Sequence, residues 1–229
     1  MRAVLRVVRA LVLVLLACAV FAASYVGVSG YLLYREALGP TPVGETVDRA
    51  REDPGYVRLD ELPQTYLDAV VAIEDHRFYG HPGFDVIAIC RAAWHDITTL
   101  SLEQGGSTIT QQLAKNLFFT QEKDFSRKAA EVFMALDLEA RYDKAEILEL
   151  YVNTSYFGDG LTGIGEAARG YLGKEPSEMT ACECALMAGL PNAPNALSAD
   201  AGLAWARAEL VVAQMERYGF DTTAFAACA

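Results

Sequence analysis

The sequence GGSTITQQLAKNLFF runs from Gly105 to Phe119 and predicts a helix with a well-defined start. Its two glycines leave the backbone free to turn. Thr108, with Gln111 three residues later, then forms a capping box of the kind that begins a helix. Residues three and four apart share one helical face, so Thr108, Gln112 and Lys115 are expected to form a polar stripe.

An apolar stripe of Ile109, Leu113 and Leu117 lies beside the polar one and can pack on a core. Two interpretations of the polar stripe stay open. A surface helix needs a polar face, which is the plainer explanation. The stripe nevertheless carries hydroxyl, amide and ammonium groups with almost no carboxylate in an acidic chain, which favours an anionic or sugar-like ligand along it.

The composition bounds the fold and the ligand class. The chain has 229 residues, of which 52% are hydrophobic, enough for one good core and an anchor. Its 19 basic and 30 acidic residues give a net charge of -11, which argues against nucleic acid as a partner, because nucleic-acid-binding proteins normally carry a basic surface. An anionic ligand would therefore need a local basic patch.

The N-terminal region predicts a transmembrane helix over residues 10–34. These 25 positions carry no charge and are long enough to cross a hydrocarbon core of about 30 Å. Arginines at positions 2, 6 and 9 precede the run, so the positive-inside rule places residues 1–9 in the cytoplasm and the rest of the chain outside. A cleaved signal peptide is the alternative, but its apolar core is usually only about 7 to 15 residues long.

The remaining chain divides into a linker and one domain. Residues 35–61 are expected to be a linker rich in Gly and Pro, either a solvated stalk or the entrance to the domain at 62–229. Helical patterns with capping residues follow one another there without a convincing strand pattern, so the fold class is mainly α. Helix starts are expected at Ser126, at Asp143 with Glu146 and at Thr180 with Glu183, and a last helix over about Leu203 to Tyr218.

Glu74 interrupts an apolar helical stripe. Its neighbours on that stripe are Leu67, Val70, Val71 and Phe78. Burial disfavours the charged form of a carboxylate and raises its pKa, which is the condition that a general base near neutral pH requires. A structural carboxylate satisfied by an Arg or by backbone amides is the alternative.

The segment after Glu74 is expected to close one helix and to start another. Asp75 can orient a loop, and His81 is expected to end the helix and to cap backbone carbonyls. Asp85 is expected to cap the next helix. The buried stripe of that helix would consist of Val86, Ile89, Cys90, Ala93 and Ile97, while Trp94, Leu100 and Leu102 fit either the core or a membrane interface.

Arg127, Lys128 and Glu131 fall within one turn near a predicted helix start. They suit a surface set of ion pairs worth a few tenths of a kcal/mol. Alternatively, two cations add their charge to the positive end of the helix dipole, which is an arrangement suited to phosphate. With Lys115 they would supply the required basic patch.

The five cysteines have no zinc-ligand spacing. A structural disulfide stays open, but buried free thiols are the expectation.

Five segments in order resemble the peptidoglycan glycosyltransferases, glycosyltransferase family 51. They cover about Leu62 to Pro194 and read EDHRFYGHPGFD, GGSTITQQLAKNLF, RKAAEVFMALDLE, KAEILELYVN and GIGEAARGYLGKEPSEMTACECALMAGLPNAP. The resemblance implies a lysozyme-like, mostly helical domain that polymerises lipid II into β-1,4 glycan strands with release of undecaprenyl diphosphate. The family includes bifunctional members with a transpeptidase domain, and this chain looks like the monofunctional form or a shortened relative.

The resemblance also implies roles for individual residues. Glu74 would be the general base on the acceptor 4-hydroxyl, and Glu131 would be the second essential carboxylate, assisting the departing diphosphate directly or through a cation. The implied substrate- and diphosphate-binding residues are Lys115, Arg127, Lys128, Thr108, Gln112 and Asn116, and the supporting residues are Asp75, Phe78, His81, Ser107 and Gln111. The segment around Ile87 to Leu102 resembles the part of these enzymes that dips into the membrane.

The implied partners are lipid II, the growing lipid-linked glycan, the membrane and other cell-wall synthesis proteins. No organic cofactor is expected, and a divalent Mg or Mn cation stays open. The implied location is the bacterial cell membrane, with a single span, a cytoplasmic N-terminus and an extracellular or periplasmic domain. Two other classes stay open: a lysozyme-like hydrolase, which would not need the cations, and a non-catalytic scaffold, which would not need Glu74 and Glu131.

Overall fold

A long N-terminal helix and a compact helical body make up the computed structural model, which describes residues 2–39, 41–91, 106–119 and 124–228. The longer elements are α1 (Arg2–Ala37), α2 (Val43–Arg51), α3 (Gln64–Glu74), α5 (Ile109–Phe118), α6 (Phe125–Glu139), α7 (Lys144–Thr154), α9 (Ala181–Gly189) and α11 (Ala201–Arg217). The short ones are η1 (Leu59–Glu61), η2 (Phe78–Gly80), α8 (Ile164–Ala167), η3 (Ala168–Leu172), η4 (Pro176–Glu178), η5 (Leu190–Asn192), α10 (Pro194–Ala199) and η6 (Thr223–Cys228). Strands β1 (Tyr156–Gly158) and β2 (Leu161–Thr162) form an antiparallel hairpin.

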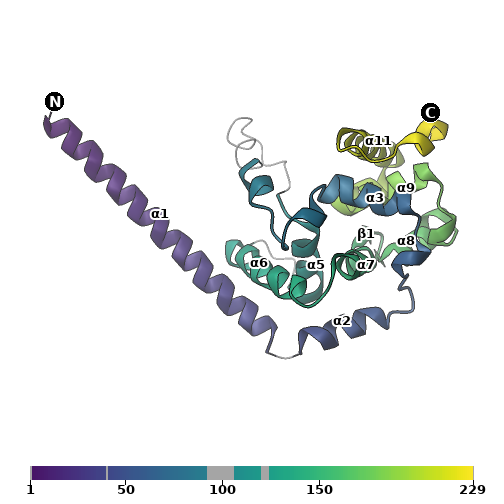
Figure 1. Cartoon of the computed structure of the whole chain (residues 1–229), viewed down its shortest axis with the longest axis horizontal. Helices are drawn as coiled ribbons and strands as arrows, with labels where there is room; N and C mark the ends of the chain where they lie inside the picture. The colour runs from purple at the N-terminus through teal and green to yellow at the C-terminus, as the bar shows by residue number, and fades with distance from the viewer. Residues whose placement is uncertain (1, 40, 92–105, 120–123, 229) are drawn as a thin grey trace.

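The helix α1 leaves the body and points away from it in Figure 1. Its segment Val4–Ala37 is long and apolar enough to cross a membrane. Among the residues that the structure describes, only the C-terminal turns of α1 contact the body, where they pack beside α6.

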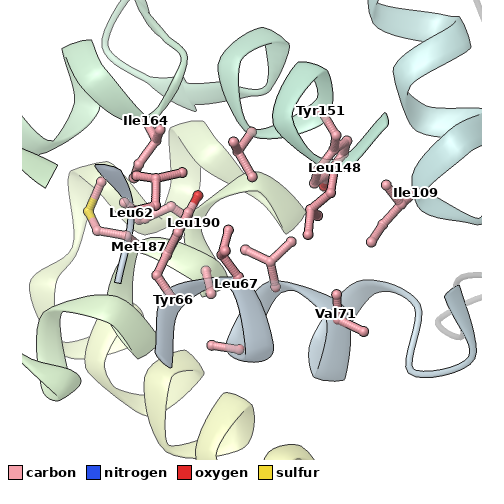
Figure 2. Packing of buried hydrophobic residues seen from close by; sticks show 14 of the residues in the cluster. Leu62, Tyr66, Leu67, Val71, Ile109, Leu148, Tyr151, Ile164, Met187 and Leu190 are labelled. Atoms are coloured by element: carbon pink, nitrogen blue, oxygen red, sulfur yellow. The ribbon is translucent and has the colours of Figure 1, made fainter. Parts of the chain in front are cut away.

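The core of the body lies between α3 and the helices that cover it. Figure 2 shows Tyr66 of α3 extending toward Leu190, and Leu148 and Tyr151 of α7 on the far side of the cluster from α3; all four side chains are buried. Ile109 of α5 closes one side of this cluster. On its other face α3 packs against α9 and α11, so α3 is held between two groups of helices.

Three predicted capping boxes are confirmed. Thr108 caps α5, Asp143 caps α7 and Thr180 caps α9, each with its partner three residues later. The helix α6 differs, because its N-cap is Asp124, whose carboxylate accepts from the Ser126 amide at 3.2 Å, and Ser126 is already helical. An aspartate two residues earlier therefore takes the place predicted for the serine.

The segment expected to be a linker contains the helix α2. Val43 and Val47 of α2 are buried against the body, so this part of the chain is the entrance to the domain and not a solvated stalk. The predicted last helix is confirmed within two residues as α11. The glycine-rich loop after α7 forms the hairpin of β1 and β2, which the sequence pattern did not predict because the strands are too short to alternate.

Asp85 caps the next helical segment as predicted, since its Oδ1 accepts from the Ala88 amide at 3.0 Å and residues 86–91 are helical. The predicted burial of its apolar stripe is wrong: Val86 and Ile89 are 56% and 43% exposed, and Cys90 is exposed too. Periodicity identifies an apolar face without saying whether protein or lipid covers it. The predictions for Ala93, Trp94, Ile97, Leu100 and Leu102 lie outside the described residues.

The sequence leaves a structural disulfide open beside the expectation of buried free thiols. Cys182 is disulfide-bonded, whereas Cys184 is a buried free thiol. Among the described side chains, Cys18, Cys90 and Cys184 are free.

Candidate active site

Glu74 is the last residue of α3, and its carboxylate faces α5. Gln112 Nε2 of α5 donates a hydrogen bond to Glu74 Oε2 at 2.6 Å. The Tyr151 hydroxyl lies 3.5 Å from Gln112 Oε1, and this contact turns the amide so that its NH2 group faces the carboxylate. Within the described part of the chain, Glu74 Oε1 has no hydrogen-bond donor, which leaves one carboxylate oxygen available to a ligand.

Burial raises the pKa of Glu74 above its ordinary value. The Gln112 hydrogen bond and the positive charges of Arg207 and Lys115 act in the opposite direction, because they stabilise the carboxylate. The sequence prediction that Glu74 has a desolvated carboxylate is thereby confirmed. Its role as a base stays a prediction.

Asp75 ties the end of α3 to the start of α5. Its Oδ2 lies 2.9 Å from His81 Nε2 and accepts from the Ile109 amide at 3.1 Å. The Gly83 amide donates to His81 Nδ1 at 3.2 Å, so the neutral ring carries its proton on Nε2 and donates it to Asp75. His81 thus holds a carboxylate, and the prediction that it ends a helix and caps carbonyls is wrong, because α3 already ends at Glu74.

Several residues that the family resemblance assigns to substrate binding or support are buried and do not line the cavity described below. Thr108 is 2% exposed, caps α5 and donates from Oγ1 to the Gly83 carbonyl at 2.6 Å. Gln111 completes that cap. Phe78 is fully buried, with the Lys144 ammonium 4.3 Å from its ring centroid. These residues are placed to fix α5 and the loop after α3.

Glu131 of α6 is 1% exposed and joins two cations on its own helix. Arg127 Nη1 donates to Glu131 Oε1 at 2.5 Å, and Lys128 Nζ donates to Oε2 at 2.8 Å. Lys128 also donates to Ser107 Oγ at 2.6 Å, which connects α6 to the segment before α5. A buried, doubly paired carboxylate fixes both cations, so this group is more than a set of exposed surface ion pairs.

A cavity of about 580 Å³ brings these groups together. Its described lining has six basic side chains and two carboxylates, although the chain as a whole is acidic. The basic residues are Arg91, Lys115, Arg127, Lys128, Arg207 and Arg217, the acidic ones are Glu74 and Glu131, and Ser107 and Gln112 are among the neutral ones. The basic patch that the net charge required is therefore present.

Two guanidinium nitrogens in this lining have no partner. Arg127 Nε and Arg207 Nε are buried and make no hydrogen bond to a described residue. A buried donor without an acceptor is costly, so an acceptor oxygen from a water molecule or a ligand is expected at each of these two groups.

The Lys115 ammonium is half-buried between the two carboxylates. Burial lowers its pKa, and the charges of Arg127 and Lys128 lower it further, whereas Glu131 and Glu74 raise it. Lys115 is therefore a cation that an arriving anion would stabilise.

A second hollow of about 670 Å³ adjoins the first and shares Gln112 and Lys115 with it. Apart from Lys115, its polar lining is neutral and consists of Gln112, Asn116, Tyr151, Thr154, Ser155, Tyr156, Thr162, Asn192 and Asn195. Amide and hydroxyl groups suit sugar hydroxyls, so one side of Lys115 is charged and the other is suited to carbohydrate.

The sequence interpretation missed the contribution of α11. One face of α11 lines the cavity of about 580 Å³ with Arg207, Gln214 and Arg217, which recur at helical spacing. Tyr218, just after α11, stacks on His76 in the same lining, with ring centroids 3.8 Å apart. The helical spacing was visible in the sequence. The direction of that face was not, because it depends on how α11 packs against α3.

The described residues contain no group of three or more His, Cys, Asp or Glu side chains that could hold a metal ion. Both oxygens of Glu131 already accept from cations. The donor set therefore does not suit a divalent cation bound by the protein at Glu131.

The model of one protein family, described as Transglycosylase, matches residues 41–216. The chain belongs to the transglycosylase family. The expectation of a mainly helical, lysozyme-like domain with one N-terminal apolar helix is confirmed with it. The match begins at α2, in agreement with the burial of that helix.

Three relatives of this transglycosylase domain are penicillin-binding proteins. The chain is 48% identical to penicillin-binding protein 1A of Vibrio cholerae over 142 residues, which are 62% of this chain and 17% of that protein. It is 45% identical to penicillin-binding protein 1F of Bacillus subtilis over 142 residues, which are 62% and 20%. It is 42% identical to penicillin-binding protein 1A of Escherichia coli over 168 residues, which are 72% and 20%. The chain thus spans about a fifth of the length of these three relatives.

Proposed function

We propose that this transglycosylase is a peptidoglycan glycosyltransferase, which polymerises lipid II into β-1,4 glycan strands and releases undecaprenyl diphosphate. The observation that carries the proposal is the cavity itself. It holds a carboxylate with a raised pKa beside a cluster of cations in an otherwise acidic chain. A carboxylate suits proton abstraction from a sugar hydroxyl, and the cations suit a diphosphate leaving group.

In the proposed reaction, the acceptor 4-hydroxyl loses its proton to Glu74 and attacks C1 of the donor sugar. The bond between C1 and the diphosphate oxygen breaks, and the electron pair leaves with the diphosphate. A single displacement with the base on the opposite face inverts the anomeric carbon, as in inverting glycosidases, with a sugar hydroxyl in place of water. The α-linked donor therefore gives a β-linked product.

The leaving diphosphate gains negative charge in the transition state. Lys115, Arg127 and Lys128 are proposed to stabilise that charge, since their positions are set before the reaction by the fold and by Glu131. Glu131 acts in this scheme by holding two cations. A Mg or Mn ion, if the reaction uses one, would be held by diphosphate oxygens, because the carboxylate of Glu131 is already paired.

The neutral hollow on the other side of Lys115 would hold sugar rings of the substrate or of the growing strand. Asn116 and Gln112 are proposed to donate hydrogen bonds to sugar hydroxyls there. Thr108 and Gln111 would support this side indirectly, through the start of α5.

We further propose a single-span protein of the bacterial cell membrane with residues 1–9 in the cytoplasm and the domain on the outer face. The basic residues before the apolar run support this orientation. A lipid-linked substrate stays in the bilayer, so α1 would keep the domain at the surface where that substrate is found. Other cell-wall synthesis proteins are proposed partners.

The test is incubation of the purified full-length protein with lipid II carrying a labelled sugar. Long lysozyme-sensitive polymer is the expected product. Labelled disaccharide without polymer would instead indicate a hydrolase, and unchanged lipid II with folded protein would indicate a scaffold. Either result would overturn the proposal.

A further inference from the structure

The end of α1 packs against α6, the helix that carries Arg127 and Lys128. The Tyr31 ring contacts the Phe133 ring edge-on, with centroids 5.6 Å apart, and the Tyr34 ring lies 6.0 Å from the same partner. Figure 1 shows this end of α1 beside α6. The apolar helix is therefore joined to the body by packing as well as by the chain.

Gly30 is the point of closest approach between the two helices. A Cβ atom there would overlap Ala129 Cβ and would lie 2.9 Å from the Ser126 carbonyl oxygen and 3.0 Å from the Ala130 amide nitrogen. Gly27, one turn earlier on α1, would meet nothing within 4 Å. The absence of a side chain is thus required at Gly30 and not at Gly27.

Exposure divides α1 into a free part and a packed part. Every side chain from Val4 to Tyr25 is exposed, whereas Gly30 is buried and its neighbours on the same face, among them Val26 and Tyr34, are partly buried. The packed part starts at Val26 and therefore overlaps the last residues of the predicted span, 10–34.

The distance along α1 places this contact at one boundary of the bilayer. Arg9 is the last charged residue before the apolar run, and Gly30 follows it by 21 positions, or about 32 Å at 1.5 Å per residue. A hydrocarbon core is about 30 Å thick. If Arg9 lies at one boundary, Gly30 and the first turn of α6 lie at the other. Phe125 starts α6 and is 81% exposed, and an exposed phenylalanine is one of the side chains that insert at a membrane boundary.

We propose that Gly30 is a positioning residue that fixes the height of α6 above the membrane, so that Arg127 and Lys128 lie at the level of a lipid-linked diphosphate. The inference rests on the proposed function and deepens it. A diphosphate esterified to a membrane lipid has a fixed depth, and cations held a few ångströms away from that depth would bind it poorly. Because α6 is packed against α1 at Gly30, the length of α1 before Gly30 sets the distance of α6 from the opposite face of the membrane.

The first test compares Gly30→Ala with its matched control Gly27→Ala in the full-length protein in vesicles. Both variants add one methyl group to the same helix and raise its helix propensity equally. We expect kcat/KM for lipid II to fall about tenfold in Gly30→Ala, as for a small misplacement of a binding group, and to stay within about twofold in Gly27→Ala. The double variant Gly30→Ala/Ala129→Gly removes the closest atom and is expected to recover part of the loss. Equal rates for the two alanine variants would overturn the proposal.

The second test changes the length of the free part of α1. Four leucines inserted between Leu15 and Leu16 lengthen it by about 6 Å without altering the contact at Gly30. We expect the bilayer thickness at which polymerisation is fastest to increase in this variant, while its rate in detergent micelles matches the wild type. An unchanged optimum across lipids of increasing acyl-chain length would contradict the proposal.

These outcomes are separable from failure of the proposed function. Absence of polymer from the wild type in every lipid and in detergent would refute the function itself. Polymer from the wild type, with all α1 variants indistinguishable from it, would refute only the role of Gly30.

Discussion

Gln112 donates a short hydrogen bond of 2.6 Å to Glu74, which joins the polar face of α5 to the end of α3. This bond favours the charged form of the carboxylate, whereas burial favours the neutral form and dominates. Glu74 therefore has a raised pKa, which the Gln112 hydrogen bond and the charges of Arg207 and Lys115 keep from rising further. The pH dependence of the proposed reaction should report this balance.

Gln112→Met should move the acidic limb of the kcat/KM profile to higher pH. The base acts when deprotonated, so the rate rises as pH rises through the pKa of Glu74, and loss of the hydrogen bond raises that pKa. Polymerisation of labelled lipid II across a pH series measures the limb. An acidic limb that stays in place while the rate falls would show that Gln112 binds substrate without tuning Glu74.

Arg207→Met should shift the same limb in the same direction, because the guanidinium charge lowers the pKa of Glu74 from α11. Arg207→Lys keeps the charge and serves as the control, with a smaller shift expected. Both variants should be measured in parallel with the wild type. A shift of equal size in the two would mean that packing of Arg207, and not its charge, matters.

Lys115→Arg should move the alkaline limb to higher pH. The pKa of Lys115 is lowered, so its ammonium loses its proton, and with it the charge that would bind diphosphate, as pH rises. An arginine stays charged over this range. The value of kcat/KM reports the free enzyme and is the quantity to measure. An alkaline limb that is the same in both proteins would assign it to another group.

Glu131→Gln should destabilise the body by about 3 kcal/mol, since it leaves the partly buried Arg127 and Lys128 without their shared carboxylate. Denaturant unfolding in detergent, followed by circular dichroism, gives the free energy of unfolding. Glu216→Gln, at an exposed position of α11, is the control and should change it by less than about 0.5 kcal/mol. Equal stability of the two variants would show that the cations do not depend on Glu131 for their partners.

The local parts of this structure were predictable from the sequence, and the long-range ones were not. Capping boxes such as Thr108 with Gln111 depend on residues three apart, so the sequence alone identifies them. The desolvation of Glu74 was also visible, as a carboxylate on an apolar stripe. In contrast, Arg207 reaches the cavity only because α11 packs on α3, more than a hundred residues away in the chain.

One prediction that the structure contradicts and one alternative that it removes have a common physical cause. The periodicity predicts that the stripe with Val86 and Ile89 lies in the core, but both side chains are exposed. The composition of residues 35–61 leaves a solvated stalk and a domain entrance open, and the burial of Val43 and Val47 decides for the entrance. Apolar periodicity and composition indicate which face avoids water. They do not say what covers that face, which depends on the packing of distant helices and on lipid.

The role of Glu74 as the base is tested most directly by two measurements on Glu74→Gln: its rate of lipid II polymerisation and the midpoint of its unfolding transition. A general base contributes about 10²- to 10⁴-fold, so the variant should lose polymer formation to at least that extent. Its midpoint at neutral pH should be equal to or higher than that of the wild type. The raised pKa of Glu74 in the folded state means that its charged form opposes folding once pH exceeds the unfolded value, and glutamine removes that charge. Polymer made at the wild-type rate by Glu74→Gln would contradict the account.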